Sequence, residues 1–259
     1  MSFDSLLYSV ADRIATITVN RPDKLNALSA AVIGELGAAI DQAIADPDVG
    51  GVILTGAGRA FVAGADISEL SGQTPLGAVA RARRGQAVFE KFERSPKPTI
   101  AAVNGFALGG GCELAMSCHV RIAGEFARFG QPEVKLGIIP GYGGTQRLPR
   151  LVGTGRALQL LMTAEVIDAT EAYRIGLANK VVPNGELLPA ATAMLTQMMS
   201  NGPLALRACI DAVIRGQDLP LSDALAYEAA HFGTLSSTTD MREGMQAFLD
   251  KRPPVFTGA

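Results

Sequence analysis

The chain has 259 residues, with 23 Lys and Arg against 25 Asp and Glu, so its formal net charge is −2. This balance excludes a general electrostatic attraction to nucleic acid or to an acidic membrane surface. With 48% apolar residues the chain can bury a sizeable core, and its length fits one large domain or two small ones.

Strand and helix patterns alternate over the first half of the chain. Apolar runs predict strands over residues 14–19, 52–54, 99–103 and 119–123. Helical spacing predicts a helix that follows the N-cap candidate Ser29, a longer arginine-rich helix over 76–94, and a helix that begins near Gly110. This order indicates an α/β fold in which sheets stack with helices outside.

The pattern changes to helices beyond about residue 150. Helices are predicted over residues 154–163, 168–175, 186–200, 203–215, 220–233 and 237–250. Within this half only residues 178–182 have the pattern of a strand. Alanine-rich apolar helices at one end of a chain often pack on another subunit, so we expect an oligomer.

Cysteine usage and the N-terminus bear on the compartment. Cys112, Cys118 and Cys209 form no CxxC pair and share no metal-ligand spacing with histidine, so we expect a reducing compartment and no metal site. The N-terminal stretch lacks the features of a signal peptide, and no uninterrupted apolar run is long enough to cross a membrane. We therefore expect a cytoplasmic protein that does not bind membranes.

A glycine triplet that leads into a helix is the first candidate site. Gly109, Gly110 and Gly111 precede Glu113, which falls in the first turn. The first N–H groups of a helix have no intrahelical acceptor and lie at the positive end of the dipole. Because glycine carries no Cβ, such an N–H can bind a carbonyl oxygen that becomes an oxyanion. The alternative is an ordinary tight turn with Glu113 stabilising the dipole.

Two further stretches have comparable features. The segment from Phe61 to Ile67 is predicted to be a small-residue loop, which can supply a second N–H donor or simply pack on the surface. Pro132 suits the first turn of a short helix and places Glu133 at its rigid start. His119 and His231 lack a neighbouring base or metal ligand, so we expect any chemistry to come from carboxylates and backbone.

Several motifs in order resemble the enoyl-CoA hydratase (crotonase) family over essentially the whole chain. The matching segments are residues 20–28, 61–67, 104–116, 129–148 and 247–256. The resemblance implies a ββα-spiral catalytic core over residues 1–195 and a helical region over 196–259. That region would mediate trimerisation and complete the coenzyme A site.

The resemblance also assigns roles to individual residues. The backbone N–H groups of Ala65 and Gly110 would hold a thioester oxygen, Glu113 and Glu133 would be the catalytic carboxylates, and Gly141 would help to place a water molecule. The implied contacts to coenzyme A, which is part of the substrate rather than a cofactor, are Lys24, Ala27, Leu28, Ala63, Ala65, Asp66, Ile67, Ser68, Phe248 and Lys251. The last two are expected to act across a subunit boundary.

The presence of both carboxylates favours an enoyl-CoA hydratase, which adds water reversibly in the syn sense to a trans-2-enoyl-CoA and gives a 3-hydroxyacyl-CoA. An enoyl-CoA isomerase on the same scaffold, relying on Glu133 alone, is one alternative. An RNA-binding homologue that uses the basic helix over 76–94 is another, although Glu90 and Glu93 dilute its charge.

We expect a homotrimer or a dimer of trimers and no nucleic-acid partner. Tyr142 stands where relatives often have a small residue, which leaves the acyl-chain preference open.

Overall fold

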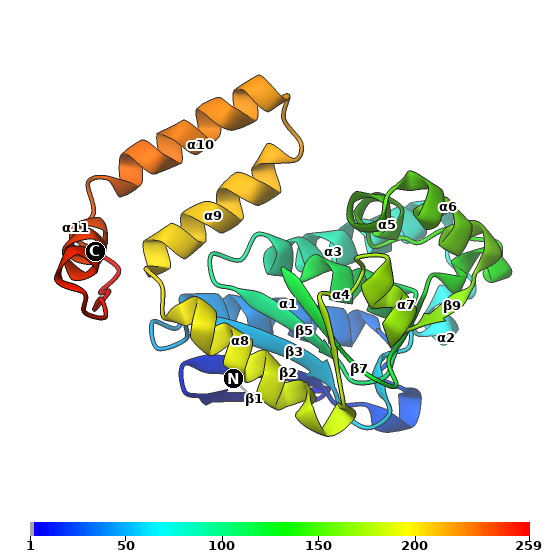
Figure 1. Ribbon diagram of the computed structural model, residues 1–259. Helices are drawn as coiled ribbons and strands as arrows, with labels where there is room; N and C mark the ends of the chain where they lie inside the picture. The colour runs from blue at the N-terminus through cyan, green and yellow to red at the C-terminus, as the bar shows by residue number, and fades with distance from the viewer. Residues whose placement is uncertain (1–2) are drawn as a thin grey trace.

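Two β-sheets form the centre of the computed structural model, which describes residues 3–259 (Figure 1). The six-stranded sheet has the order β1 (Leu6–Ala11), β2 (Ile14–Val19), β3 (Gly51–Gly56), β5 (Thr99–Val103), β7 (Val120–Gly124) and β10 (Lys180–Val182). The four-stranded sheet has the order β4 (Ala60–Val62), β6 (Phe106–Leu108), β8 (Arg128–Gly130) and β9 (Val166–Asp168).

Each turn of the chain places one strand in each sheet. The pairs β3 and β4, β5 and β6, and β7 and β8 follow one another, and each pair is followed by helical structure. Within each sheet these strands are parallel, whereas β1 and β2 form an antiparallel pair and β9 runs antiparallel to β8. This repetition confirms the predicted ββα spiral.

Helices cover both sides of the larger sheet. The helices within residues 3–259 are α1 (Ala30–Ala45), α2 (Ile67–Leu70), α3 (Pro75–Glu93), α4 (Gly110–Ser117), α5 (Gly144–Val152), α6 (Thr154–Thr163), α7 (Ala169–Arg174), α8 (Leu187–Met199), α9 (Pro203–Gly216), α10 (Leu221–Leu235) and α11 (Thr239–Asp250), with 3₁₀ turns η1 (Pro22–Lys24), η2 (Pro132–Leu136) and η3 (Asn184–Glu186). Of these, α1 and α3 pack on one face of the larger sheet and α8 on the other. Figure 1 shows α9, α10 and α11 extending away from the sheets. Within residues 3–259 no helix combines the length and the apolar composition needed to span a bilayer.

The core lies on both faces of the larger sheet. In β3, Val52 and Leu54 join the large apolar cluster shared with α1 and α3, while Ile53 faces the opposite cluster. That second cluster includes Leu187 and Leu195 of α8. Since both faces are buried, these strands consist of continuous apolar residues, which is why their positions were predictable. The expected boundary after residue 195 lies within α8.

The sequence predictions missed the short strands. The segment from Phe61 to Ile67, predicted to be a loop, begins inside β4 and ends in α2. In the second half β9 is a strand in addition to β10. The strands of the smaller sheet have three residues each, which is too few to show a period of two. Their pairing, rather than their composition, makes them strands.

Glycines allow α4 to lie directly on β4. A Cβ on Gly111 would overlap the backbone carbonyl oxygen of Val62. Gly109 has a φ of +51°, a conformation that residues with a Cβ rarely adopt. The triplet therefore serves the close approach of a helix to a strand, and this approach brings the N-terminus of α4 to the loop that follows β4.

We predict that Gly111→Ala destabilises the protein by at least about 3 kcal/mol, because the new methyl group meets fixed backbone and cannot be accommodated by a side-chain rotation. The matched control is Gly34→Ala on α1, where a Cβ meets nothing within 4 Å. That change should stabilise the protein by about 0.5–1 kcal/mol through helix propensity. Urea unfolding of both variants measures the difference. Equal stabilities of the two variants would contradict the close approach.

Candidate active site

Two backbone N–H groups face the same region without an acceptor. Gly110 is the first residue of α4, and Ala65 lies between β4 and α2. Leu28 donates to the carbonyl of Gly64 and accepts from the N–H of Asp66, both at 2.9 Å. This pairing turns the N–H of Ala65 to the other side of the segment. In the part of the chain that the structure describes, neither the Ala65 N–H nor the Gly110 N–H donates to a protein atom.

The two donor segments are neighbours in space. A Cβ on Gly109 would lie 3.8 Å from Cα of Gly64, and a Cβ on Gly110 would lie 3.0 Å from Cδ1 of Leu28. Leu28 is also the bridge partner of Ala65. The arrangement brings together the two N–H donors predicted from the sequence, as an oxyanion hole requires.

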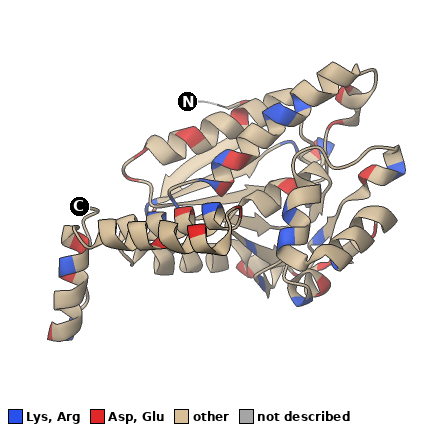
Figure 2. Cartoon of the chain, turned by 90° about the horizontal axis from the view of Figure 1, so that it is seen from above, with Lys and Arg blue, Asp and Glu red and all other residues tan. Residues whose placement is uncertain are grey.

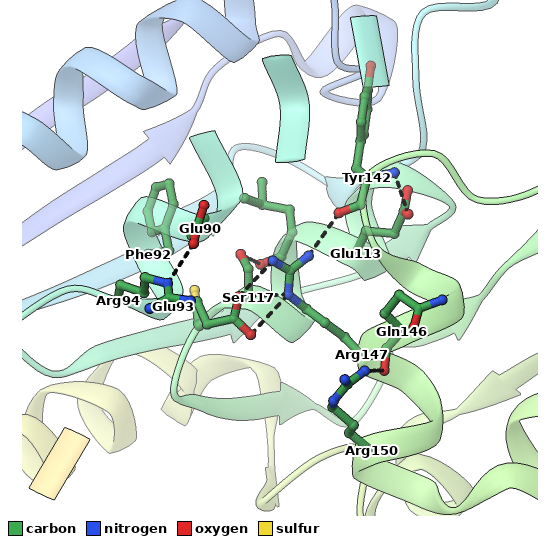
Figure 3. Close-up of polar contacts among 12 residues, drawn as sticks. Glu90, Phe92, Glu93, Arg94, Glu113, Ser117, Tyr142, Gln146, Arg147 and Arg150 are labelled. Atoms are coloured by element: carbon green, nitrogen blue, oxygen red, sulfur yellow. Dashed lines mark hydrogen bonds and ion pairs between the residues drawn. The ribbon is translucent and has the colours of Figure 1, made fainter. Parts of the chain in front are cut away.

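Glu113 lies one turn after Gly110 and is almost completely buried. Its Oε1 accepts a hydrogen bond from the N–H group of Tyr142 at 2.7 Å (Figure 3). It accepts a second one from the N–H group of Gly144, also at 2.7 Å. The glycine-rich loop before α5 therefore holds the carboxylate with its backbone. Hydrogen bonds from N–H groups stabilise the ionised form of a carboxylate.

Glu133 has the opposite environment. It is half-buried at the start of η2, directly after Pro132, as predicted. Its Oε2 is buried, and no group within residues 3–259 forms a hydrogen bond with it. Its Oε1 would lie 2.9 Å from a Cβ on Gly109, so this carboxyl group faces the same glycine segment. An unpaired buried carboxyl oxygen is available to a substrate or to water.

Both carboxyl groups titrate near neutrality. Burial raises the pKa of Glu113 to about 7; the hydrogen bond from Gly144 opposes the shift, and the charge of Glu133 adds to it. Burial likewise raises the pKa of Glu133 to about 7. Groups with a pKa close to the working pH can both accept and donate protons, which suits general acid–base catalysis.

The loop at residues 141–144 forms one wall of the site. The carbonyl of Gly141 accepts a hydrogen bond of 2.9 Å from Nε2 of Gln86. The buried Tyr142 ring packs edge-on against Phe89 with 5.4 Å between ring centroids, and its Cδ2 would lie 3.3 Å from a Cβ on Gly110. The ring therefore fills the space between α3 and the start of α4.

Sequence reasoning missed two residues beside the site. Gln131 is buried and donates from Nε2 to the carbonyl of Gly109 at 3.3 Å, and its Oε1 is unpaired in the described part of the chain. Arg147 donates from Nη1 to the carbonyl of Tyr142 at 2.8 Å. Both lie in segments that carried the family resemblance, which was the only available signal for them.

The structure brings most of the predicted coenzyme A contacts together. The N–H of Ala63 donates to the carbonyl of Leu25 at 3.0 Å, which places the segments at 24–28 and 63–68 side by side. Asp66 caps α2 by accepting from the N–H of Ser68 at 3.3 Å and from its hydroxyl group at 2.6 Å. Ala65, one of the two N–H donors, lies within the second of these segments. The paired segments 24–28 and 63–68 therefore adjoin the two donors.

Two predicted contacts lie elsewhere in the chain. Phe248 is on α11 and is 83% exposed, and Lys251 follows the same helix. Figure 1 shows α11 at the far end of the arm formed by α9 and α10, away from α4. A single chain therefore does not bring these two residues to Ala65 and Gly110.

The histidines have structural partners. His119 accepts the N–H of Thr99 with Nδ1 at 3.0 Å, and its Nε2 lies 3.0 Å from the carbonyl oxygen of Glu93. His231 contacts Asp211 across α9 and α10. Neither lies beside Glu113 or Glu133 in the contacts of the described residues.

Comparison with known proteins gives matches along the whole chain. Residues 10–259 match the family model described as Enoyl-CoA hydratase/isomerase. The chain is 48% identical to a short-chain-enoyl-CoA hydratase of Clostridium acetobutylicum, with 97% of each chain covered. It is 48% identical to a crotonyl-CoA hydratase of Syntrophomonas wolfei, with 99% of each covered. A crystal structure of an enoyl-CoA hydratase from Bacillus anthracis superposes with a TM-score of 0.94 at 40% identity, covering 99% of this chain and 100% of that one.

The raised pKa of Glu113 predicts a pH dependence of stability. Because its pKa in the folded protein is higher than in the unfolded chain, its contribution favours the folded state at low pH. That contribution is lost as the pH rises from the unfolded value of 4.5 through about 7. Glu113→Gln removes this titration, so between pH 4 and 8 the stability of the variant relative to wild type should rise by about 2–3 kcal/mol. Urea unfolding at several pH values measures the difference, and a difference independent of pH would contradict the raised pKa.

Proposed function

The chain belongs to the enoyl-CoA hydratase/isomerase family, and we propose that it is an enoyl-CoA hydratase. It adds water reversibly, in the syn sense, to a trans-2-enoyl-CoA and gives a 3-hydroxyacyl-CoA. The observation that carries this proposal is the combination of two N–H donors, from Ala65 and Gly110, that have no acceptor within residues 3–259, with two carboxyl groups of raised pKa, Glu113 and Glu133. An isolated oxyanion hole or a single carboxylate would not distinguish hydration from the other reactions of a thioester.

The donor pair stabilises the charge that hydration creates. Attack of water at the β-carbon of an enoyl thioester moves an electron pair onto the carbonyl oxygen and forms an enolate. Two fixed N–H groups bind that oxygen without reorganisation, and losing one such donor typically costs about 10²–10³ in rate. The close approach of α4 to the loop after β4 gives both donors a fixed position before substrate arrives.

The two carboxyl groups divide the proton transfers. Glu113 accepts two N–H bonds, which favour its ionised form, so it is suited to take a proton from the attacking water. Glu133 has an oxygen without a partner in the described part of the chain and is suited to hold a proton and give it to the α-carbon. The water oxygen bonds to the β-carbon as one water proton passes to Glu113. The proton of Glu133 bonds to the α-carbon as the enolate electron pair returns from the oxygen. Transfer of the proton from Glu113 to the ionised Glu133 then restores the starting state.

The alternatives have weaker support. An isomerase needs only one acid to move a proton between carbon atoms. The backbone hydrogen bonds that fix the second acid, Glu113, would then serve no catalytic step. An RNA-binding role would need free cations on the segment 76–94, but three of its basic residues are paired with acids: Arg81 with Glu69, Lys91 with Asp41, and Arg94 with Glu90. In the view of Figure 2 blue and red residues are interspersed around the sheet.

The acyl group that fits this site is short. Two of the relatives are named as a short-chain-enoyl-CoA hydratase and a crotonyl-CoA hydratase. The buried ring of Tyr142, packed beside Gly110, reduces the space next to the donor pair. Together these observations support a substrate of about four carbons, with coenzyme A bound along Lys24, the segment 27–28 and the segment 63–68.

We also propose that the site is completed by another copy of the chain in a homotrimer or a dimer of trimers. The helical arm beyond residue 196 exposes large apolar side chains, and in Figure 2 the helices that lead to the C-terminus are mostly tan. These exposed residues include Val213, Leu219, Leu221, Leu225, Phe232, Met245, Phe248 and Leu249. Burying them between copies would bring Phe248 and Lys251 to a neighbouring site.

The free cysteines are consistent with a cytoplasmic location, which we include in the proposal.

Activity of the carboxyl variants tests the function. Glu113→Gln and Glu133→Gln should each lower kcat for the hydration of crotonyl-CoA by about 10²–10⁴-fold, because each removes one proton transfer. Loss of the absorbance of the conjugated thioester measures the rate, and a series of longer enoyl-CoA substrates measures the chain preference. Glu90→Gln on the exposed side of α3 is the control and should leave kcat unchanged. Isomerisation of a 3-enoyl-CoA that survives in Glu113→Gln, without hydration in wild type, would favour the isomerase.

Solution mass tests the assembly. Light scattering during size-exclusion chromatography should give about three or six times the chain mass of 26.9 kDa. Replacing Phe232 and Leu225 with Glu should lower this mass, because charge then lies in the interface. A monomer of full activity would contradict the shared site.

A further inference from the structure

We infer that Arg147 is a positioning residue for Glu113, which it holds through the backbone of the loop at residues 141–144. The inference rests on the proposed function, since it concerns the carboxylate assigned to the attacking water. The hydrogen bonds of Arg147 go to Glu93 and to the loop, so its effect on Glu113 is indirect. The evidence is a continuous set of contacts from α3 through Arg147 to Glu113.

The contact with the loop is made at Tyr142. Nη1 of Arg147 donates to the backbone carbonyl of Tyr142 at 2.8 Å, while the N–H of the same residue donates to Oε1 of Glu113 at 2.7 Å (Figure 3). The guanidinium and the carboxylate therefore hold the two ends of one residue's backbone. Moving the carbonyl would turn the N–H away from Glu113.

Glu93 fixes the guanidinium from α3. Nη2 of Arg147 donates to Oε2 of Glu93 at 2.7 Å, and Nε lies 3.2 Å from both carboxylate oxygens. The side chain of Arg147 is only 14% exposed. The backbone carbonyl of Glu93 in turn contacts Nε2 of His119, whose Nδ1 accepts the N–H of Thr99 on β5. A two-point pair anchored to a central strand gives Arg147 one defined position.

Gly143 gives the loop a backbone conformation that leaves room for the guanidinium of Arg147. Its φ is +111°, and a Cβ there would overlap Nη1 of Arg147. The carbonyl of Gly143 also accepts the N–H of Arg147 at 2.8 Å, which begins α5. The conformation that aims the N–H groups of Tyr142 and Gly144 at Glu113 is thus the one that leaves room for the guanidinium.

Arg147 also acts on the charge of Glu113. The titratable groups that face this carboxylate are Glu133, Arg147, the thiol of Cys112 and the phenol of Tyr142. Glu133 raises the pKa of Glu113, and Arg147 lowers it. Loss of the guanidinium should therefore raise the pKa of Glu113, which a purely structural ion pair far from the site would not do.

The test compares Arg147→Gln and Arg147→Lys with Arg150→Gln. Arg150 lies one turn further along α5, where its guanidinium donates to the carbonyl of Gln146 at 2.9 Å and to Asp218 at 3.3 Å on the surface. Arg147→Gln should lower kcat for crotonyl-CoA by about 10–100-fold, with KM changed less than about threefold. In a plot of kcat against pH, the change in rate that follows ionisation of Glu113 (the Glu113 limb) should move to higher pH. Arg147→Lys keeps the charge without the two-point pair, so its kcat should fall while its pH limb stays near that of wild type. Arg150→Gln should behave as wild type.

A second readout does not depend on turnover. The carboxyl carbon of Glu113, assigned by its absence in Glu113→Gln, should titrate at higher pH in ¹³C NMR spectra of Arg147→Gln than in wild type. If wild type hydrates crotonyl-CoA but Arg147→Gln has the same kcat and the same titration, or loses no more activity than Arg150→Gln, the positioning role is refuted. If wild type hydrates no enoyl-CoA while the titration still shifts, the proposed function fails and the positioning role stands.

Discussion

The direct contact between α4 and β4 is the constraint on which the site depends. No side chain separates the two backbones, since a Cβ on Gly111 would overlap the carbonyl oxygen of Val62. This contact places the N–H of Gly110 beside the loop that carries Ala65. It also brings Glu113, one helical turn later, under the loop at 141–144. The six-stranded sheet, buried on both faces, provides the rigid support that such a contact requires.

The second constraint is electrostatic. The charges of the two carboxyl groups, Glu113 and Glu133, interact, and burial raises the pKa of each to about 7. The two carboxyl groups differ in their partners. Glu113 accepts hydrogen bonds from two backbone N–H groups and lies near Arg147, while one oxygen of Glu133 has no partner among residues 3–259. In the proposed mechanism, this inequality, rather than the identity of the residues, is the reason for assigning one acid to water and the other to the α-carbon. Unequal environments for paired acids are a general way to separate their roles.

The candidate site residues could be named from the sequence because several motifs in order resemble one family. Taken alone, the glycines and the first-turn acids fit an ordinary turn and a stabilised helix dipole equally well. Strands such as β3 and β5 were predictable since both faces are buried. The three-residue strands of the smaller sheet were not, because only pairing defines them. Arg147 and Arg150 look alike in the sequence, and only packing distinguishes the buried guanidinium from the exposed one. The proposed coenzyme A contacts of Phe248 and Lys251 would need another copy of the chain, because α11 lies away from α4 within one chain (Figure 1).

The binding of the thioester carbonyl by Ala65 and Gly110 can be observed directly in a crystal structure with a non-hydratable acyl-CoA analogue. We expect the thioester oxygen to lie about 2.7–3.1 Å from the backbone nitrogen atoms of both residues, with the β-carbon facing Glu113 and Glu133. A bound analogue whose carbonyl oxygen lies more than about 4 Å from both nitrogen atoms would contradict it.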